Sequence, residues 1–222
     1  MTSRHRAFIL QNTRLQHPPC VPEVRLHLAD EIMPLWRKIE EEKGEVDVPP
    51  PFWAFAWAGG QAIARYLLDH PEEVDGKRVL DFGAGSGLCA IAAMKAGAVH
   101  ALAADIDVFC RQALIMNARA NGVRVSFTGR DLLDDDPPQV DVILAGDIWY
   151  EQPLAARVLP WLQAAQARGI RILLGDPGRA YVPPDGIVRL AEYQVPATRD
   201  LEGVEIKRTG VLSLSVSEPN IR

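Results

Sequence analysis

The chain has 222 residues, 48% of them hydrophobic and 24% charged, with a formal net charge of −5. This length and composition suit one α/β domain with a substantial core, or one domain with a small extension. The negative charge and the scattered lysines and arginines exclude a general nucleic-acid binder, which would carry a basic face. No apolar stretch approaches the roughly 20 residues that span a bilayer, so we expect no membrane association. Three cysteines without metal-ligand spacing predict reduced thiols in a cytosol-like compartment.

Residues 1–50 are predicted to form an N-terminal extension. The first 14 residues are basic and free of acids, as in an organelle presequence, but we expect them to belong to the mature protein. Apolar residues at strand spacing predict a short strand at 24–28, and apolar residues at helical spacing predict a helix over 32–39. Two interpretations stay open for the region: a cap over the sheet, or a lid or docking surface for a substrate.

Residues 52–57 hold the densest group of aromatic side chains, directly after three prolines that cannot be helical. Most of these rings are expected in the core. Because an aromatic face attracts cations, Trp57 is the predicted contact to a positively charged cofactor. It precedes Gly59 and Gly60, which we expect to be mobile. The helix that follows is predicted to end near Asp69.

An apolar strand at residues 79–82 leads into a glycine-rich turn and then a helical stretch. Glycines let the backbone turn sharply and approach a ligand, and the bare N–H groups of the helix start face that ligand. The spacing is G-x-G-x-G, which differs from the dinucleotide pattern G-x-G-x-x-G and lacks the Gly-Lys-Ser/Thr ending of a phosphate loop. Asp81, just before the first glycine, suits a ligand that carries an ammonium and a sulfonium.

The pattern Asp-x-Gly-x-Gly-x-Gly at a strand end resembles motif I of class I S-adenosylmethionine-dependent methyltransferases. The cofactor implied by this resemblance is S-adenosyl-L-methionine. The predicted contacts to it in this turn are Asp81, Gly83, Gly85, Ser86 and Gly87.

A second strand is predicted at residues 100–104 and is followed by two acidic residues. Asp105 lies 22 residues after Gly83, a separation that suits an acid accepting hydrogen bonds from a ribose diol. Asp107 is predicted to cap the next helix. A third strand is predicted at residues 124–128.

Asp131 and Leu132 follow the third strand. In this fold class their position meets the adenine, where an acid accepts from the exocyclic amine and an apolar neighbour covers the ring. Residues 134–136 are three adjacent aspartates, which favour a solvated turn over a metal site.

A fourth strand at residues 141–145 ends in Gly146 and Asp147, and it should adjoin the strand of the glycine-rich turn. Ligands of open parallel sheets sit beyond the carboxyl ends of the strands. We therefore predict that Gly146 contacts the cofactor, that Asp147 faces the methyl group, and that Tyr150 lines the site. The alternative is that Asp147 only caps the following helix.

A fifth strand at residues 171–174 ends in the segment 175–179, where Asp176 or Arg179 contacts a substrate protein or closes a loop. The last two strands, at 188–195 and 210–216, are expected to pair antiparallel around a charged surface connection. The predicted fold is a Rossmann-like, seven-stranded class I methyltransferase sheet with helices on both faces, at residues 51–222.

Taken together, the aromatic segment 51–61, the glycine-rich turn, Asp105 to Asp107, residues 146–150 and the Gly-Asp-Pro-Gly-Arg segment occur in the order of one family. From about Phe8 to about Leu214 the chain resembles the protein-lysine methyltransferases of the electron transfer flavoprotein β subunit. Ala58 departs from the proline usual in that family.

The resemblance implies methyl transfer from S-adenosylmethionine to lysine ε-amines of the electron transfer flavoprotein β subunit. Asp147 would orient the amine, and Tyr150 would complete the lysine channel. The location would be the cytoplasm in a bacterium or the mitochondrial matrix in a eukaryote, and a monomer is favoured.

Other functions also fit the residues. The acceptor could be another protein, such as a ribosomal one, or a small amine, because fold does not settle function. A non-catalytic cofactor-binding interaction protein is an alternative of another class. A nicotinamide oxidoreductase is disfavoured by the glycine spacing.

Overall fold

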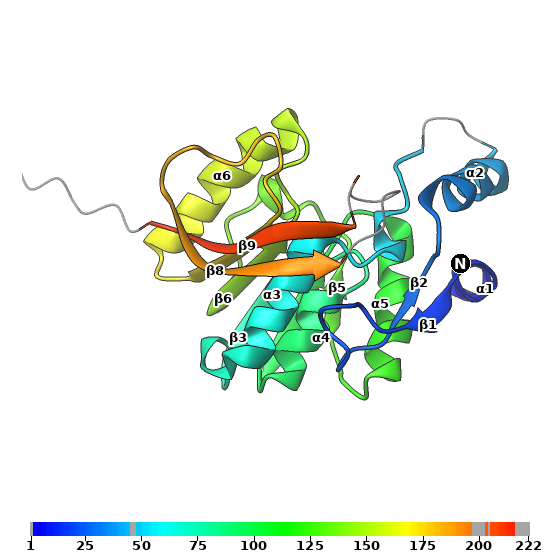
Figure 1. Ribbon diagram of the computed structural model, residues 1–222, viewed down its shortest axis with the longest axis horizontal. Coiled ribbons are helices and arrows are strands. Elements are labelled where there is room, and N and C mark those ends of the chain that lie inside the picture. The colour runs from blue at the N-terminus through cyan, green and yellow to red at the C-terminus, as the bar shows by residue number, and fades with distance from the viewer. Residues whose placement is uncertain (1, 45–47, 197–202, 204, 216–222) are drawn as a thin grey trace, which may run out of the picture.

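Seven strands form one sheet in the computed structural model, which describes residues 2–44, 48–196, 203 and 205–215 (Figure 1). The strands are β3 (Arg78–Phe82), β4 (His100–Ala104), β5 (Ser126–Thr128), β6 (Val142–Gly146), β7 (Arg171–Asp176), β8 (Ile187–Pro196) and β9 (Ile206–Leu214). Their spatial order is β5-β4-β3-β6-β7-β9-β8, with β9 antiparallel to both neighbours. This confirms the predicted class I sheet. The connection expected before β9 lies mostly outside the described residues.

The strand order reverses next to β3, which pairs in parallel with β4 on one side and β6 on the other. The chain therefore leaves β3 in one direction and returns to its other side, so the carboxyl ends of β3, β4 and β6 meet at one switch point. The prediction that the strand of Asp147 adjoins the strand of the glycine-rich turn is confirmed by the register Phe82↔Ala145.

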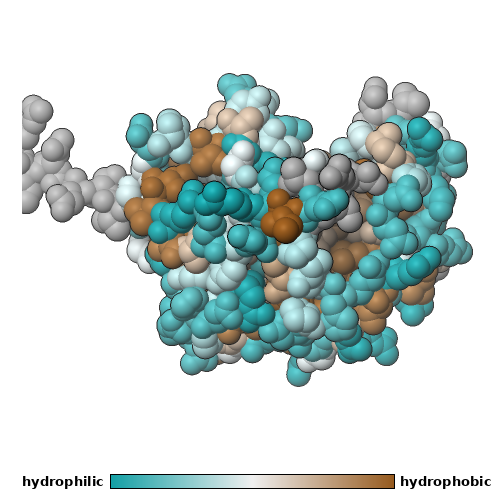
Figure 2. Space-filling model, in the orientation of Figure 1, coloured by the Kyte–Doolittle hydropathy of each residue, from teal (hydrophilic) through white to brown (hydrophobic). Residues whose placement is uncertain are grey.

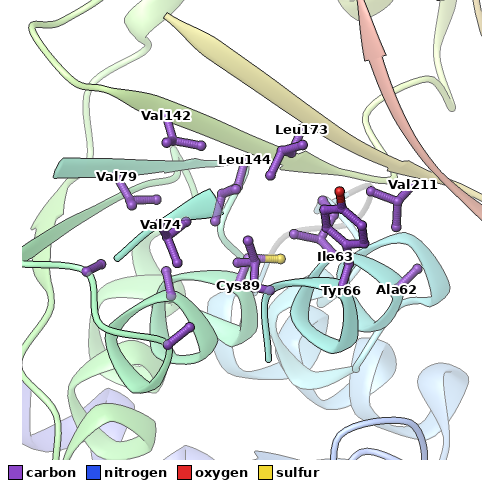
Figure 3. Packing of buried hydrophobic residues seen from close by; sticks show 14 of the residues in the cluster. Ala62, Ile63, Tyr66, Val74, Val79, Cys89, Val142, Leu144, Leu173 and Val211 are labelled. Atoms are coloured by element: carbon purple, nitrogen blue, oxygen red, sulfur yellow. The ribbon is translucent and has the colours of Figure 1, made fainter. Parts of the chain in front are cut away.

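Helices cover both faces of the sheet (Figure 1). On one face lie α3 (Ala58–Asp69), α4 (Leu88–Lys95) and α5 (Val108–Ala120), and on the other lies α6 (Gln152–Ala167). Side chains alternate along a strand, so Val79 packs toward α3 and α4 whereas Leu80 packs toward α6. Figure 3 shows the first of these cores, in which strand residues such as Leu144 meet Ile63 of α3 and Cys89 of α4.

The N-terminal segment packs on α5 and on the short helix η1 (Phe52–Ala54). It consists of α1 (Thr2–Asn12), the antiparallel strands β1 (Arg14–Gln16) and β2 (Leu26–Leu28), and α2 (Ile32–Lys43). Phe8 and Leu35 share one buried cluster with Trp53 and Phe109, whose rings stack 5.4 Å apart. The strand at 24–28 and the helix at 32–39 are confirmed, whereas α1 and β1 were not predicted. The domain boundary after residue 50 and the interpretation of residues 1–50 as a lid remain predictions.

Hydrophilic residues cover most of the face seen in Figure 2, and separate hydrophobic areas lie between them. Within the described ranges, no helix combines the length and the apolar character that a membrane span requires. Cys20, Cys89 and Cys110 are free thiols. Burial raises the pKa of the Cys89 and Cys110 thiols well above the ordinary value, so both stay protonated.

Glycines bring the backbone at the start of α3 against the ends of β6 and β7. A Cβ on Gly59 would overlap the carbonyl oxygen of Gly175, and a Cβ on Gly175 would overlap that of Gly59. A Cβ on Gly146 would lie 2.8 Å from the backbone nitrogen of Gly60. The expected mobility of Gly59 and Gly60 is therefore wrong: both lie in the first turn of α3, and at Gly59 the backbone of the sheet leaves no room for a side chain.

Two alanine substitutions in the same helix turn test this contact. Gly59→Ala should lower the free energy of unfolding by ~1–3 kcal/mol or more, because it overpacks backbone against backbone. Gly60→Ala should be neutral or stabilising by up to ~1 kcal/mol, because its Cβ would meet only ordinary contacts at 3.8 Å or more and alanine favours a helix. Urea unfolding of both variants measures the difference, and equal effects would contradict the contact.

Candidate functional site

The three glycines of the glycine-rich turn differ in how closely other atoms surround them. Gly83, Gly85 and Gly87 all have positive φ, at +66°, +50° and +80°. A Cβ on Gly83 or Gly85 would have its nearest neighbours at 3.8–3.9 Å, whereas one on Gly87 would overlap the Leu114 side chain of α5. The first two glycines thus leave room beside the backbone for a ligand, and the third lets α4 and α5 pack.

Asp105 fixes the turn to the end of β4. Its Oδ2 accepts a hydrogen bond from the Gly85 backbone N–H at 2.8 Å, and its Oδ1 accepts one from the Asp107 N–H at 2.9 Å. Asp107 in turn accepts from the Phe109 N–H, which confirms it as the N-cap of α5. Asp105, the residue predicted to bind the ribose, therefore lies beside the glycine-rich turn. The two hydrogen bonds already hold its carboxylate in place.

Asn117 is a polar anchor that sequence reasoning missed. Its fully buried side chain on α5 donates to the carbonyl of Ser86 at 2.9 Å and accepts from the backbone N–H of His27 at 2.8 Å. The turn is thereby tied to the N-terminal segment. The available signal was an amide at a helix position that faces the core, where an unpaired polar group would be costly.

Asp81 lies beneath the turn and is only 2% exposed. Its Oδ2 accepts from the Ala90 N–H at 2.9 Å, in the first turn of α4. Burial raises the pKa of Asp81 to about 8; the hydrogen bond from Ala90 opposes this rise, and the nearby charge of Asp105 adds to it. Near neutral pH the carboxyl group of Asp81, directly under the turn, is therefore mostly protonated.

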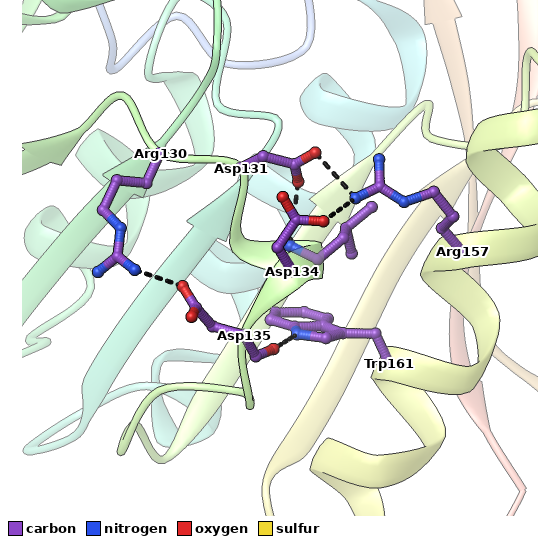
Figure 4. Close-up of polar contacts among 7 residues, drawn as sticks. Arg130, Asp131, Asp134, Asp135, Arg157 and Trp161 are labelled. Carbon is purple, nitrogen blue, oxygen red and sulfur yellow. Dashed lines mark hydrogen bonds and ion pairs between the residues drawn. The ribbon is translucent and has the colours of Figure 1, made fainter.

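Asp131 and Leu132 lie where α6 meets the short helix η3 (Leu132–Asp134) (Figure 4). Asp131 caps η3 through the Leu133 N–H, and its Oδ2 pairs with Arg157 of α6 at 2.9 Å. Arg157 also pairs with Asp134, and Leu132 is half-buried against α6. Arg157 was missed because the pairing crosses 26 residues of sequence.

The adjacent aspartates of this loop are largely exposed and pair with arginines. Asp134 is held by Arg157, and Asp135 is held by Arg130 (Figure 4). Among the described residues, no group of three or more histidine, cysteine, aspartate or glutamate side chains is arranged to hold a metal ion.

Asp147 is the one non-glycine residue in the described part of the chain with a positive φ, at +57°. Its N–H donates to the Gly175 carbonyl at 2.8 Å. Its Oδ2 accepts from the Gly60 N–H at 3.1 Å, and its Oδ1 accepts from Arg179 Nη2 at 2.7 Å. The N-cap of α6 is Glu151, so the alternative that Asp147 only caps this helix is excluded.

Aromatic rings form a rim next to Asp147. The centroid of Phe52 lies 5.6 Å from that of Trp57 and 5.5 Å from that of Tyr150. Trp57 Nε1 donates to the Phe52 carbonyl at 3.0 Å, which holds the rim together. Tyr150 is exposed, whereas the neighbouring Trp149 is buried in the core on the α6 side. The rim thus combines ring faces and a phenol at the carboxyl edge of the sheet.

The sequence model of one family, Ribosomal protein L11 methyltransferase (PrmA), matches residues 59–149. The electron transfer flavoprotein beta subunit lysine methyltransferase of Xenopus laevis is 38% identical over 196 residues, covering 86% of this chain and 78% of that protein. The protein of the same name from Danio rerio is 35% identical over 222 residues, covering 97% of this chain and 83% of that protein. The chain belongs to the electron transfer flavoprotein β-subunit lysine methyltransferase family.

Solved structures agree with the class I methyltransferase fold. Magnesium protoporphyrin IX methyltransferase from Synechocystis PCC 6803, solved with bound SAM, matches with a TM-score of 0.50 at 16% identity. The match covers 71% of this chain and 78% of that one. In this lysine methyltransferase family member, the glycine-rich turn, Asp105 and Asp147 accordingly lie at the switch point of a methyltransferase sheet.

The buried Asp81 predicts how stability depends on pH. Below pH 3.8 the folded and unfolded chains both carry its proton; as pH rises toward about 8 only the folded state keeps it, so this stabilising contribution is lost. Relative to Asp81→Asn, the wild-type free energy of unfolding should fall by up to ~1.4 kcal/mol per pH unit between pH 5 and 7. Urea unfolding of both proteins at several pH values measures this, and parallel curves would contradict the raised pKa.

Proposed function

We propose that this chain transfers methyl groups from S-adenosylmethionine to lysine ε-amines of the electron transfer flavoprotein β subunit. The observation that carries the proposal is Asp147: a carboxylate in a left-handed backbone conformation, held by α3 and Arg179 beside an aromatic rim. Strained backbone concentrates at functional sites. The substrate is the one that the names of the relatives give.

The residues around the glycine-rich turn fit the cofactor. Gly83 and Gly85 leave space that a Cβ would fill, and Asp105 offers carboxylate lone pairs at their side. A carboxylate suits both a ribose diol and an ammonium. We propose that the cofactor is held by Trp57, Asp81, Gly83, Gly85, Ser86, Gly87, Asp105, Asp131, Leu132 and Gly146. The bound cofactor supplies an electrophilic methyl group on a sulfonium, and the protein supplies orientation.

Asp147 and Tyr150 would act on the acceptor. A free lysine has a pKa of ~10.4, so its ε-amine must lose a proton before its lone pair can attack. Asp147 accepts a hydrogen bond from the amine and aims this lone pair, while Tyr150 completes the wall of the channel. Positioning of this kind contributes much of a group-transfer rate. Burial raises the pKa of the Tyr150 phenol, so the wall stays neutral.

Oligomeric state, partners and cellular location belong to the same proposal. We propose that the protein works as a monomer on a protein substrate, without nucleic acid or membrane. The reaction would take place in the cytoplasm of a bacterium or in the mitochondrial matrix of a eukaryote.

A ribosomal protein is the second candidate substrate, because the matching family model carries that name. The match ends at residue 149, however, and begins at residue 59. It therefore covers the cofactor turn and Asp147 but neither the aromatic rim at Phe52 and Trp57 nor the loop of Arg179. Phe52 and Arg179 are not among the residues proposed to hold the cofactor, so the region outside the match includes the proposed acceptor side of the site, and the flavoprotein is favoured.

The direct test uses tritiated S-adenosylmethionine and purified electron transfer flavoprotein. Wild-type enzyme should label lysine in the β subunit, and Asp147→Ala should lower the rate at least ~100-fold, since the amine loses its orienting acceptor. Cofactor binding, measured by calorimetry, should change little. Glu72→Ala, an exposed carboxylate before β3 at the opposite edge of the sheet, is the matched control and should keep full activity.

Other outcomes would redirect the proposal. Loss of cofactor binding together with activity in Asp147→Ala would make Asp147 a cofactor ligand or a structural residue. Tight cofactor binding with no label on the flavoprotein would discard this substrate, and the assay would move to whole extract. A lack of label there would support a non-catalytic binding protein.

A further inference from the structure

The Arg179 guanidinium lies between Asp147, the proposed contact to the acceptor, and Trp57, a proposed contact to the cofactor. Its Nη2 is 2.7 Å from Asp147 Oδ1, and its Cζ is 5.7 Å from the ring centroid of Trp57. The Arg179 side chain is 20% exposed and that of Asp147 is 12% exposed. Water screens such a pair much less than it screens a surface ion pair. The charge of Arg179 is therefore felt strongly at Asp147.

The loop after β7 is built to hold this arginine in place. Asp176, 4% exposed at the end of β7, accepts through Oδ1 from the N–H of Gly178 at 2.6 Å and of Arg179 at 2.7 Å. Gly178 has a φ of +87°, which lets the chain turn back toward β6. The backbone of this loop thus fixes where the Arg179 side chain begins.

An isolated carboxylate would be a poor acceptor for the incoming lysine. A negative charge at hydrogen-bond distance favours the protonated ammonium, which has no lone pair to attack with. Asp147 already gives one oxygen to Arg179 and the other to the Gly60 N–H, and a carboxylate has about four lone-pair sites. It can still accept from an amine while its charge is offset.

We propose that Arg179 is a positioning residue that offsets the charge of Asp147 and fixes its carboxylate, so that the substrate lysine enters as the neutral amine. This inference rests on the proposed lysine methyltransferase function. It assigns the Gly-Asp-Pro-Gly-Arg segment a role in the protonation state of the acceptor.

Among the described residues, the groups discussed next do not replace the positive charge of Arg179 beside Asp147. Cys89 stays protonated because burial raises the pKa of its thiol well above the ordinary value. Tyr150 stays neutral, and Asp176 is acidic. The amino end of α3 adds a partial positive charge at Gly60, but this is the same in every variant. Removal of the guanidinium charge therefore leaves the site more negative.

The test compares Arg179→Gln, Arg179→Lys and wild type in single-turnover methylation of the flavoprotein from pH 6.5 to 10.5. Wild type should show a rate midpoint below the ~10.4 of free lysine. Arg179→Gln should move this midpoint up by about one pH unit or more, which gives an about tenfold deficit at low pH that shrinks at high pH. Arg179→Lys keeps the charge and should keep the wild-type midpoint.

Arg189→Gln is the matched control, because Arg189 lies on β8 and pairs with Glu192. It should leave rate and midpoint unchanged. Cofactor affinity and thermal unfolding of each variant check that the fold and the turn are intact.

Three results would overturn the inference: an Arg179→Gln deficit that is equal at every pH, no deficit at all, or the same midpoint shift in Arg179→Lys. A wild-type midpoint that is not below that of free lysine would overturn it as well. If wild type labels no lysine of the flavoprotein, the proposed function fails instead. Labelling by the wild-type enzyme therefore distinguishes failure of the proposed function from failure of the inference on Arg179.

Discussion

The contact between the start of α3 and the sheet depends on three glycines, Gly59, Gly146 and Gly175, that let one backbone lie directly against another. Gly59 and Gly60 begin the helix, and Gly146 and Gly175 end two strands. Because no side chain intervenes, the amide of Gly60 comes within hydrogen-bond distance of Asp147, whose own amide is bonded to Gly175. The site is thus a consequence of how closely a helix can approach a sheet.

The acidic residues of the site each serve the fold before they can serve a ligand. Asp81 accepts from an N–H in the first turn of α4, Asp105 holds the glycine-rich turn, and Asp131 caps η3. Satisfied carboxylates stay in one orientation, so little ordering remains when a ligand arrives. Asp147 pairs with an arginine, as Asp131 does, but the Asp147 and Arg179 side chains are only 12% and 20% exposed, against 35% and 47% for Asp131 and Arg157. Charge balance, and not only hydrogen bonding, decides what it can accept.

Much of this arrangement could be predicted from the sequence because it is local. Apolar runs that end in an acid placed Asp105 and Asp147 at strand ends, and glycine spacing identified the turn. The partners of these acids were not predictable, because they come from distant segments: Arg179 lies 32 residues from Asp147, and Arg157 lies 26 from Asp131. Gly59 and Gly60 were expected to be mobile, since a sequence does not show that the backbone of a distant strand packs against a glycine. Helix α1 escaped detection because it lacks an apolar face of its own and depends on packing against α5.

The left-handed backbone at Asp147 restricts what can replace it. Glycine, asparagine and aspartate enter this region readily, whereas branched side chains do so at a cost. Asparagine has almost the shape of aspartate and would preserve the turn and the amide bond to Gly175, while removing the charge that Arg179 balances. An Asp147→Asn substitution during evolution would therefore keep the fold and lose the proposed role of the carboxylate. A descendant of this chain could remain a well-folded ligand-binding protein long after it had ceased to be an enzyme.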